Sequence, residues 1–295
     1  MNKTIIGVSL FSFSVLFSAT TFAQTTPDYA KLIEQAHQKY KSNNDGKVAD
    51  YIPALATYSP KNFAITIATV DGKIYQVGDV NKPFPMESLS KVFTMALAME
   101  QHGPQVVLDK LGANATGMPF NSGLAVELTK GAPENPLVNA GAMSTVSLIE
   151  AKDKTDRWNK ILDNLNVWAD ATLTVNEPVF KSEMETNQHN QALAKLMESY
   201  NSFYGNTDEA VEIYTRQCSV DITVEQLAKM GAVLANKGKS PFNGKQLLVV
   251  QNTQESKFTT ADINKAIAVP AEQTLAAMNQ PAQVQEHSQR RSMHI

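Results

Sequence analysis

Ser88 and Lys91 are the two residues whose types and spacing point most directly to chemistry. They lie in residues 86–93 (MESLSKVF), and a spacing of three puts both side chains on one face of a helix. A serine hydroxyl becomes a nucleophile when a neighbouring group takes its proton, and a lysine amine can do so once its pKa is lowered. Ser90 is offset from Ser88 by about 200° around a helix, so we expect it to face away from the site. The pattern predicts a serine nucleophile with a lysine base, and its alternative is a solvated Ser/Lys pair on a helix surface.

The elements that must position this pair can be predicted from hydrophobic periodicity and turn residues. The apolar run after Lys91 predicts a buried helix over residues 88–101, with the serine in its first turn. Two β-branched runs, residues 63–70 and 73–78, flank Asp71-Gly72, which predicts a β-hairpin. Two strands followed mostly by helices indicate an α+β fold. The other expected helices are 29–40, 140–150, 154–169, 188–203, 208–217 and 224–236, the last of them opened by a capping box of Thr223 and Gln226.

Composition excludes several classes of function. The 295 residues carry 26 Lys+Arg against 29 Asp+Glu, so the formal net charge of −3 gives no reason to expect nucleic acid or an anionic membrane as partner. One cysteine cannot form an internal disulfide, and we interpret Cys218 as a small buried side chain. Five scattered histidines show no metal-ligand spacing, so we expect neither a metal nor another cofactor.

The N-terminus has the pattern of an export signal. Lys3 precedes an apolar stretch over residues 5–19, and Thr21-Phe22-Ala23 resembles a small-x-small cleavage site. We expect cleavage after Ala23 and a periplasmic or secreted protein that has no membrane attachment afterwards. An uncleaved membrane anchor is the alternative. The expected division is a signal peptide at 1–23, a catalytic domain at 24–250 and a divergent C-terminal tail at 251–295.

Several motifs occur in an order that resembles the serine-dependent glutaminases related to β-lactamases. They are GKVADYIP, TYSP, TVDG, the S-x-S-K segment and NPLVNAGAM, and the likeness covers about residues 46–238. The resemblance implies a fold like that of β-lactamases and penicillin-binding proteins, with a helical cluster packed on an antiparallel sheet. It also implies that Ser88 attacks the side-chain amide of L-glutamine while Lys91 accepts the proton, and that the protein forms a homodimer or homotetramer.

The same resemblance implies which residues contact the substrate besides Ser88. A carboxylate can pair with the α-ammonium of glutamine, while amide and hydroxyl donors hold its carboxylate and carbonyl. Each candidate also has a plain structural alternative: a helix cap for Asn139, a solvated surface acid for Glu183, a polar residue on a helix face for Asn190, and core aromatics for the two tyrosines. The substrate-binding residues implied are Tyr51, Asn139, Glu183, Asn190 and Tyr214.

The C-terminal part departs from the family pattern. The glutaminases resembled here carry Tyr-Asp-x-Ser-Gly and a glycine-rich K-S-G-V-x-G-G segment, whereas no glycine follows Gly244 in this sequence. We therefore expect the sheet to have lost its C-terminal strands, the hairpin to have unpaired edges and the active site to lack one wall, which would lower turnover. The alternatives to an active glutaminase are a catalytically impaired truncated relative that binds glutamine and a β-lactamase or penicillin-binding type of serine hydrolase.

Overall fold

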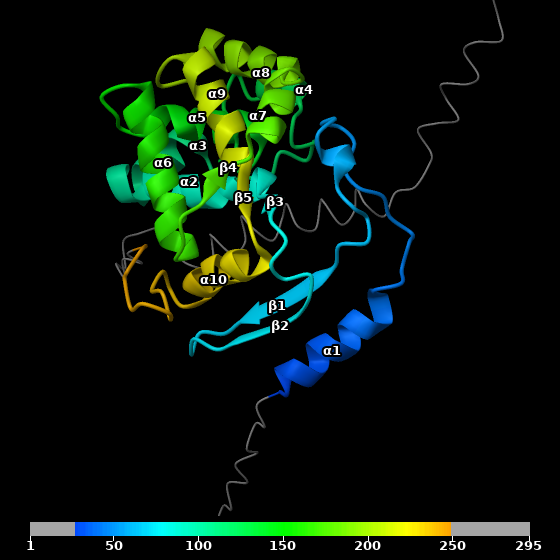
Figure 1. Cartoon of the computed structure of the whole chain (residues 1–295). Helices are drawn as coiled ribbons and strands as arrows, with labels where there is room; N and C mark the ends of the chain where they lie inside the picture. The colour runs from blue at the N-terminus through cyan, green and yellow to red at the C-terminus, as the bar shows by residue number, and fades with distance from the viewer. Residues whose placement is uncertain (1–26, 249–295) are drawn as a thin grey trace, which may run out of the picture.

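The computed structural model describes residues 27–248, and within them a cluster of helices lies above a β-hairpin (Figure 1). The expected signal peptide at 1–23 and the tail at 251–295 lie outside the described residues, as do residues 24–26 and 249–250 of the expected catalytic domain. No helix in residues 27–248 is both long and apolar enough to cross a membrane.

The hairpin forms as predicted. Strands β1 (Ala64–Ala68) and β2 (Ile74–Gly78) pair antiparallel with Ile67 opposite Tyr75. Gly72 takes φ +82° in the connecting turn, a conformation that glycine adopts without steric cost. Helices α1 (Tyr29–Tyr40) and α10 (Val224–Ala235) pack on this hairpin, the former against β2 and the latter against β1 (Figure 1). Among residues 27–248 no third strand joins it.

A second, smaller sheet leads directly into the segment that carries Ser88. Its three strands, β3 (Phe84–Pro85), β5 (Val220–Ile222) and β4 (Thr174–Val175), pair antiparallel in the order β3-β5-β4. The backbone N–H of Met86 continues the pairing by donating to the carbonyl of Val220 at 2.8 Å. Strands of two or three residues leave too little periodicity to be predicted from the sequence.

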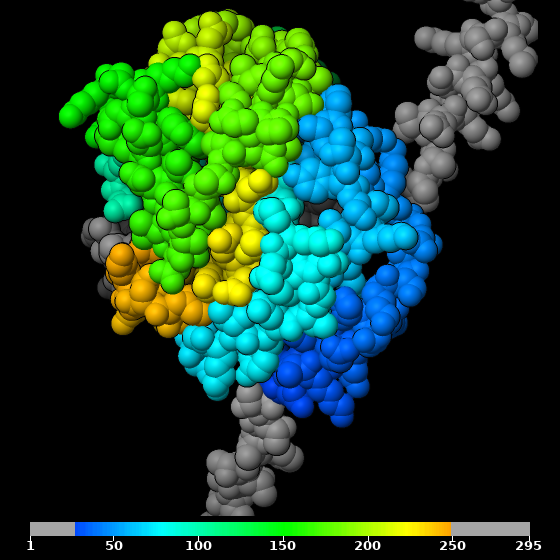
Figure 2. Space-filling model, viewed as in Figure 1, coloured from blue at the N-terminus to red at the C-terminus, as the bar shows by residue number. Residues whose placement is uncertain are grey.

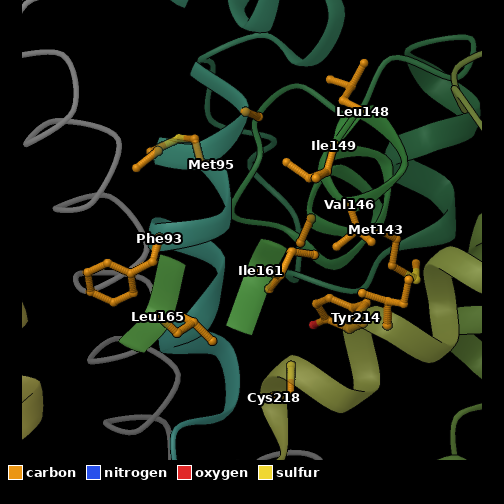
Figure 3. Close-up of a cluster of buried hydrophobic side chains, with 14 of the residues drawn as sticks. Phe93, Met95, Met143, Val146, Leu148, Ile149, Ile161, Leu165, Tyr214 and Cys218 are labelled. Atoms are coloured by element: carbon orange, nitrogen blue, oxygen red, sulfur yellow. The ribbon is translucent and has the colours of Figure 1, made fainter. Parts of the chain in front are cut away.

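The core is built mainly from four helices: α2 (Ser90–His102), α5 (Asn139–Leu148), α6 (Lys154–Ala169) and α9 (Thr207–Cys218). Every residue of α5 is buried, so this helix lies at the centre of the cluster. Figure 3 shows Tyr214 of α9 beside Met143 of α5, and Cys218 of α9 belongs to the same buried cluster. Asn139, at the start of α5, and Tyr214 therefore belong to rigid, well-packed elements.

The predicted helices occur with shifted ends. The helix expected over 188–203 ends earlier, as α8 (Gln188–Ser199), because Asn201 adopts a left-handed conformation with φ +58°. The capping box of Thr223 and Gln226 at the start of α10 is confirmed. Three short helices and a 3-10 turn were not predicted from the sequence: α3 (Pro104–Leu111), α4 (Gly123–Leu128), α7 (Glu177–Met184) and η1 (Leu55–Thr57).

Candidate active site

Ser88 lies in a 3-10 turn between β3 and α2. The turn, η2 (Glu87–Leu89), begins with Glu87 at φ +49°, and the Ser88 side chain is exposed. The predicted position in the first turn of the α-helix is therefore wrong by two residues, since α2 begins at Ser90. Lys91 is the second residue of α2. The left-handed conformation of Glu87 makes the chain turn sharply after β3, so the Ser88 hydroxyl is exposed just beyond the end of that strand.

Lys91 is buried, with 3% of its surface exposed, although its neighbour Ser88 is not. Its Nζ donates to the carbonyl of Leu137 at 3.0 Å and to Oδ1 of Asn139 at 2.7 Å. Removal from water lowers the pKa of Lys91 to about 8, against smaller opposing effects of Cys218, Glu183 and Glu87. Because Lys91 is buried, the alternative of a solvated Ser/Lys pair on a helix surface is excluded.

Asn139 connects three of the predicted site residues. Its Oδ1 accepts from Lys91 and from the Tyr214 hydroxyl at 3.2 Å, while its Nδ2 donates to Oδ1 of Asn190 at 3.0 Å. Asn139 does not cap the helix, because it is the first residue of α5, the N-cap position is Val138 and no side chain caps this end. In the loop before it, Oδ1 of Asn135 accepts from the backbone N–H groups of Leu137 and Val138. The side chain of Asn139 is thus free to organise the site.

Gly141 allows the start of α5 to approach the preceding loop. A Cβ at this position would lie 1.9 Å from the carbonyl oxygen of Asn135, far inside van der Waals contact. The close approach keeps Asn135 over the first turn of α5. The glycine in VNAGAM is therefore required by the backbone packing that holds Asn139.

Tyr214 is buried on α9 and keeps its proton. Burial, with smaller effects of Cys218 and Glu183, holds the pKa of the Tyr214 phenol well above its usual value. The Ser88 hydroxyl is near enough to interact with the phenol and opposes this rise. The ring centroid of Tyr214 lies 5.7 Å from Nζ of Lys91. Tyr214 is therefore a neutral hydrogen-bond donor between Asn139 and the Ser88 turn.

Two acidic side chains lie near the lysine, and both are held away from water. Burial raises the pKa of Glu183, in the last turn of α7, to about 8, and Glu87 adds to the rise. Burial likewise raises the pKa of Glu87 to about 7, while Lys91 opposes the rise. Ser219 Oγ donates to Glu183 at 3.4 Å, whereas Oε1 of Glu87 is buried without a hydrogen-bond partner. A solvated surface position is excluded for Glu183.

Tyr51 is the most exposed predicted residue, with 67% of its surface accessible. It lies just before η1, in the blue N-terminal segment that runs along one side of the molecule (Figure 2). Desolvation of its hydroxyl, followed by the charges of Glu87 and then Glu183, raises the pKa of Tyr51 to about 12. The charges of the two acids thus add to the pKa rise that desolvation causes at the Tyr51 hydroxyl. The alternative of a core aromatic is wrong for this residue.

Three residues near this site were not predicted from the sequence. Glu87 was overlooked because an acid beside a serine has no distinctive spacing, and only its left-handed backbone marks it. Phe120 is 60% exposed and lies in a loop, and its ring centroid is 5.9 Å from Nζ of Lys91. Hydrophobic periodicity does not predict the position of a loop residue. Gln217 lies on the buried face of α9 and carried no signal of its own. Cys218 is a buried free thiol, as predicted.

The arrangement is suited to acyl transfer from a small polar substrate. An exposed serine hydroxyl, a buried amine with a lowered pKa and a neutral tyrosine lie together beside two acidic side chains. The described residues contain no group of three or more His, Cys, Asp or Glu side chains that could hold a metal ion. Fold and S-x-x-K turn together place the chain in the β-lactamase-like class.

Comparison with known proteins narrows this class to one family. The glutaminase family model matches residues 46–263, and the chain belongs to the glutaminase family. It is 46% identical over 239 residues to a glutaminase of Colwellia psychrerythraea (strain 34H / ATCC BAA-681), covering 80% of this chain and 77% of that one. It is 44% identical over 220 residues to glutaminase 1 of Escherichia coli (strain K12), covering 75% and 71%.

Solved structures give the same result. The fold matches a probable glutaminase, ybaS, with a TM-score of 0.74 and 41% identity over 81% of this chain and 74% of the other. It also matches a probable glutaminase from Bacillus subtilis complexed with 6-diazo-5-oxo-L-norleucine, with a TM-score of 0.68 and 26% identity over 82% and 72%. The helical cluster with small sheets is thus the fold of this family, as the resemblance implied.

Proposed function

We propose that this protein hydrolyses L-glutamine to L-glutamate and ammonia through an acyl-enzyme on Ser88, with Lys91 as the base. The observation that carries the proposal is the hydrogen bonding of Lys91. As a neutral amine, Lys91 has two N–H donors and one lone pair, and both donors are used by Leu137 and Asn139. The lone pair is left to accept a proton from the hydroxyl three residues earlier.

The reaction follows from these positions. Ser88 Oγ attacks the side-chain amide carbon of glutamine while Lys91 takes the hydroxyl proton. When the carbon–nitrogen bond breaks, that proton passes to the leaving nitrogen, which departs as ammonia. Water then adds to the glutamyl ester, the ester bond breaks, and the proton from water returns to Ser88 as glutamate leaves. Neutral Tyr214 donates a hydrogen bond at the site without adding charge.

The polar residues around this pair account for recognition of a free amino acid. Glu183, which forms no ion pair with a cation in the described residues, is suited to the α-ammonium. Tyr51, which is exposed, can contact the substrate from the solvent side. Asn190 and Tyr214 hold the amide of Asn139 from two directions, so the remaining amide N–H donors of Asn139 and Asn190 can bind the substrate carboxylate and carbonyl. Glutamine is the partner that these groups fit.

Ammonia release from L-glutamine by the purified protein, measured beside Ser88→Ala, tests the proposal. The wild type should release ammonia and the variant should not, while the thermal shift caused by glutamine persists in both. Equal ammonia release by both proteins would overturn the role of Ser88. A thermal shift without ammonia release by the wild type would instead favour an impaired relative. Labelling of Ser88 by a β-lactam, with no labelling by a glutamine-derived diazoketone, would instead favour a serine hydrolase of the β-lactamase or penicillin-binding type.

We also propose that the protein is exported and oligomeric. The pattern of residues 1–23 supports cleavage after Ala23 and a periplasmic or secreted location. The resemblance to glutaminases supports a homodimer or homotetramer. N-terminal sequencing of the protein recovered from its native compartment tests the first proposal, and sedimentation velocity tests the second. An uncleaved N-terminus or a monomer would contradict them.

A further inference from the structure

A line of buried polar side chains runs behind the Ser88 turn. Ser90 and Gln217 are completely buried, although both carry polar groups that bind water well. The Ser90 hydroxyl donates to the carbonyl oxygen of Glu87 at 2.8 Å, and Nε2 of Gln217 donates to Ser90 Oγ at 3.1 Å. The other end of the Gln217 amide accepts from the hydroxyl of Thr94 at 2.8 Å. Ser90 and Gln217 are 127 positions apart in the chain, and the hydrogen bond between them is connected to the backbone carbonyl just before Ser88.

The carbonyl of Glu87 belongs to the same peptide group as the N–H of Ser88. In a planar trans peptide these two groups point in opposite directions. The backbone N–H of Ser90 also donates to the Glu87 carbonyl, so two donors hold this oxygen toward the start of α2. The N–H of Ser88 must then point away from α2.

The backbone of Glu87 needs such support. Its φ of +49° is unfavourable for a residue with a side chain, and residues of this kind persist only where their surroundings hold them. The bond from Met86 N–H to the Val220 carbonyl fixes the chain on one side of Glu87, and Ser90 fixes it on the other. Rotation of the Glu87–Ser88 peptide would break the bonds to Ser90.

We propose that Gln217 and Ser90 are positioning residues that hold the Glu87–Ser88 peptide so that the N–H of Ser88 serves as an oxyanion donor. The proposal rests on the proposed function, because the oxyanion forms when Ser88 attacks the amide. Gln217 fixes the Ser90 hydroxyl, Ser90 fixes the Glu87 carbonyl, and the shared peptide plane fixes the N–H. Neither residue touches the substrate. A buried polar network of this kind is difficult to explain by packing alone, since apolar side chains of similar size fill a core without needing partners.

Ser90→Ala tests the proposal against Ser144→Ala, a matched control. Ser144 is also completely buried, and its hydroxyl donates to a backbone carbonyl, that of Ser202, at 2.9 Å. Both variants should lower the melting temperature by similar amounts. Only Ser90→Ala should lower kcat, by about 10- to 100-fold, less than the 100- to 1,000-fold typical of removing an oxyanion donor outright. KM should change less than threefold, because substrate binding precedes oxyanion formation.

Gln217→Met, which keeps the size of the side chain but removes the donor to Ser90, should lower kcat by about 3- to 10-fold in the same assay. Equal kcat values for Ser90→Ala and Ser144→Ala would overturn the proposal. So would a rise in KM with kcat unchanged.

A crystal structure of Ser90→Ala separates failure of this inference from failure of the proposed function. If the wild type releases no ammonia, the glutaminase proposal fails, and the geometry of the variant still decides the positioning role. In Ser90→Ala we expect the Glu87–Ser88 peptide to rotate or to occupy two orientations. A peptide unchanged from the wild-type structure would contradict it.

Discussion

The amide oxygen of Asn139 lies 2.7 Å from the amine nitrogen of Lys91, and both side chains are buried. The amide supplies a hydrogen-bond acceptor without a charge. It therefore satisfies the amine in its neutral form, in which Lys91 can act as a base. A carboxylate at the same distance would instead stabilise the ammonium form.

Asn139→Asp should slow the reaction by raising the pKa of Lys91. An acid at this position should raise the pKa of Lys91 above its present value of about 8, so that less of the neutral base exists at neutral pH. We expect kcat at pH 7 to fall by about 10-fold or more and the rising limb of the pH–rate profile to move to higher pH. Asn139→Ala is the control, since it removes the amide without adding a charge. An unchanged limb in the aspartate variant would contradict the role of Lys91 as the titrating base.

Glutamine binding should release protons near neutral pH. Burial raises the pKa of Glu183 to about 8 and that of Glu87 to about 7, so at pH 7 much of this pair is protonated in the free protein. Pairing with the α-ammonium of the substrate favours the ionised form. Calorimetric titration of Ser88→Ala with glutamine, in buffers of different ionisation enthalpy, should show net proton release. The release should fall in the double variant Ser88→Ala/Glu183→Gln, and binding without proton exchange at pH 7 would contradict the role of Glu183.

Glu87→Gln should change how stability depends on pH. Below about pH 4.5 the carboxyl is protonated in both the folded and the unfolded chain; between 4.5 and about 7 only the unfolded chain releases the proton. The free energy of unfolding should therefore fall as the pH rises through this window. In Glu87→Gln that part of the loss should disappear, which urea unfolding at several pH values measures. A wild type and a variant with parallel profiles would contradict the buried state of Glu87.

Gly141→Ala should destabilise the protein and impair the site. The new Cβ would meet the Asn135 carbonyl at 1.9 Å and force the start of α5 away from its loop. Gly231→Ala, in α10, is the control, because nothing lies within 4 Å of its Cβ position and alanine favours a helix by about 1 kcal/mol. Thermal melts should show a loss of several degrees for the first and a small gain for the second. Equal melting temperatures would contradict the close approach.

Local patterns in the sequence predicted local structure well. The hairpin at Asp71-Gly72 and the capping box of Thr223 and Gln226 depend on contacts between near neighbours, and both are confirmed. The placement of Ser88 in an α-helix was wrong because a 3-10 turn, which begins at the left-handed Glu87, delays the start of α2 to Ser90. Periodicity records which face is buried, whereas backbone strain at a single residue leaves no such signal.

The contacts that build the site join parts of the chain far apart in sequence. Lys91 meets Leu137 and Asn139 across 46 and 48 residues, and Ser90 meets Gln217 across 127. The motifs identified candidate residues for the site, but their hydrogen bonds follow from the packing of α2, α5 and α9. The role of Tyr51 as a substrate contact stays a prediction, whereas Phe120 and Glu87 became visible only in the folded chain.

The central claim is that the Ser88 hydroxyl carries the acyl group, and it can be tested by mass spectrometry of the protein quenched during turnover of L-glutamine. Peptide mapping should find a glutamyl ester on Ser88, absent without substrate and absent in Ser88→Ala. A glutamyl group on Ser90, on Cys218 or on any other residue would contradict the account.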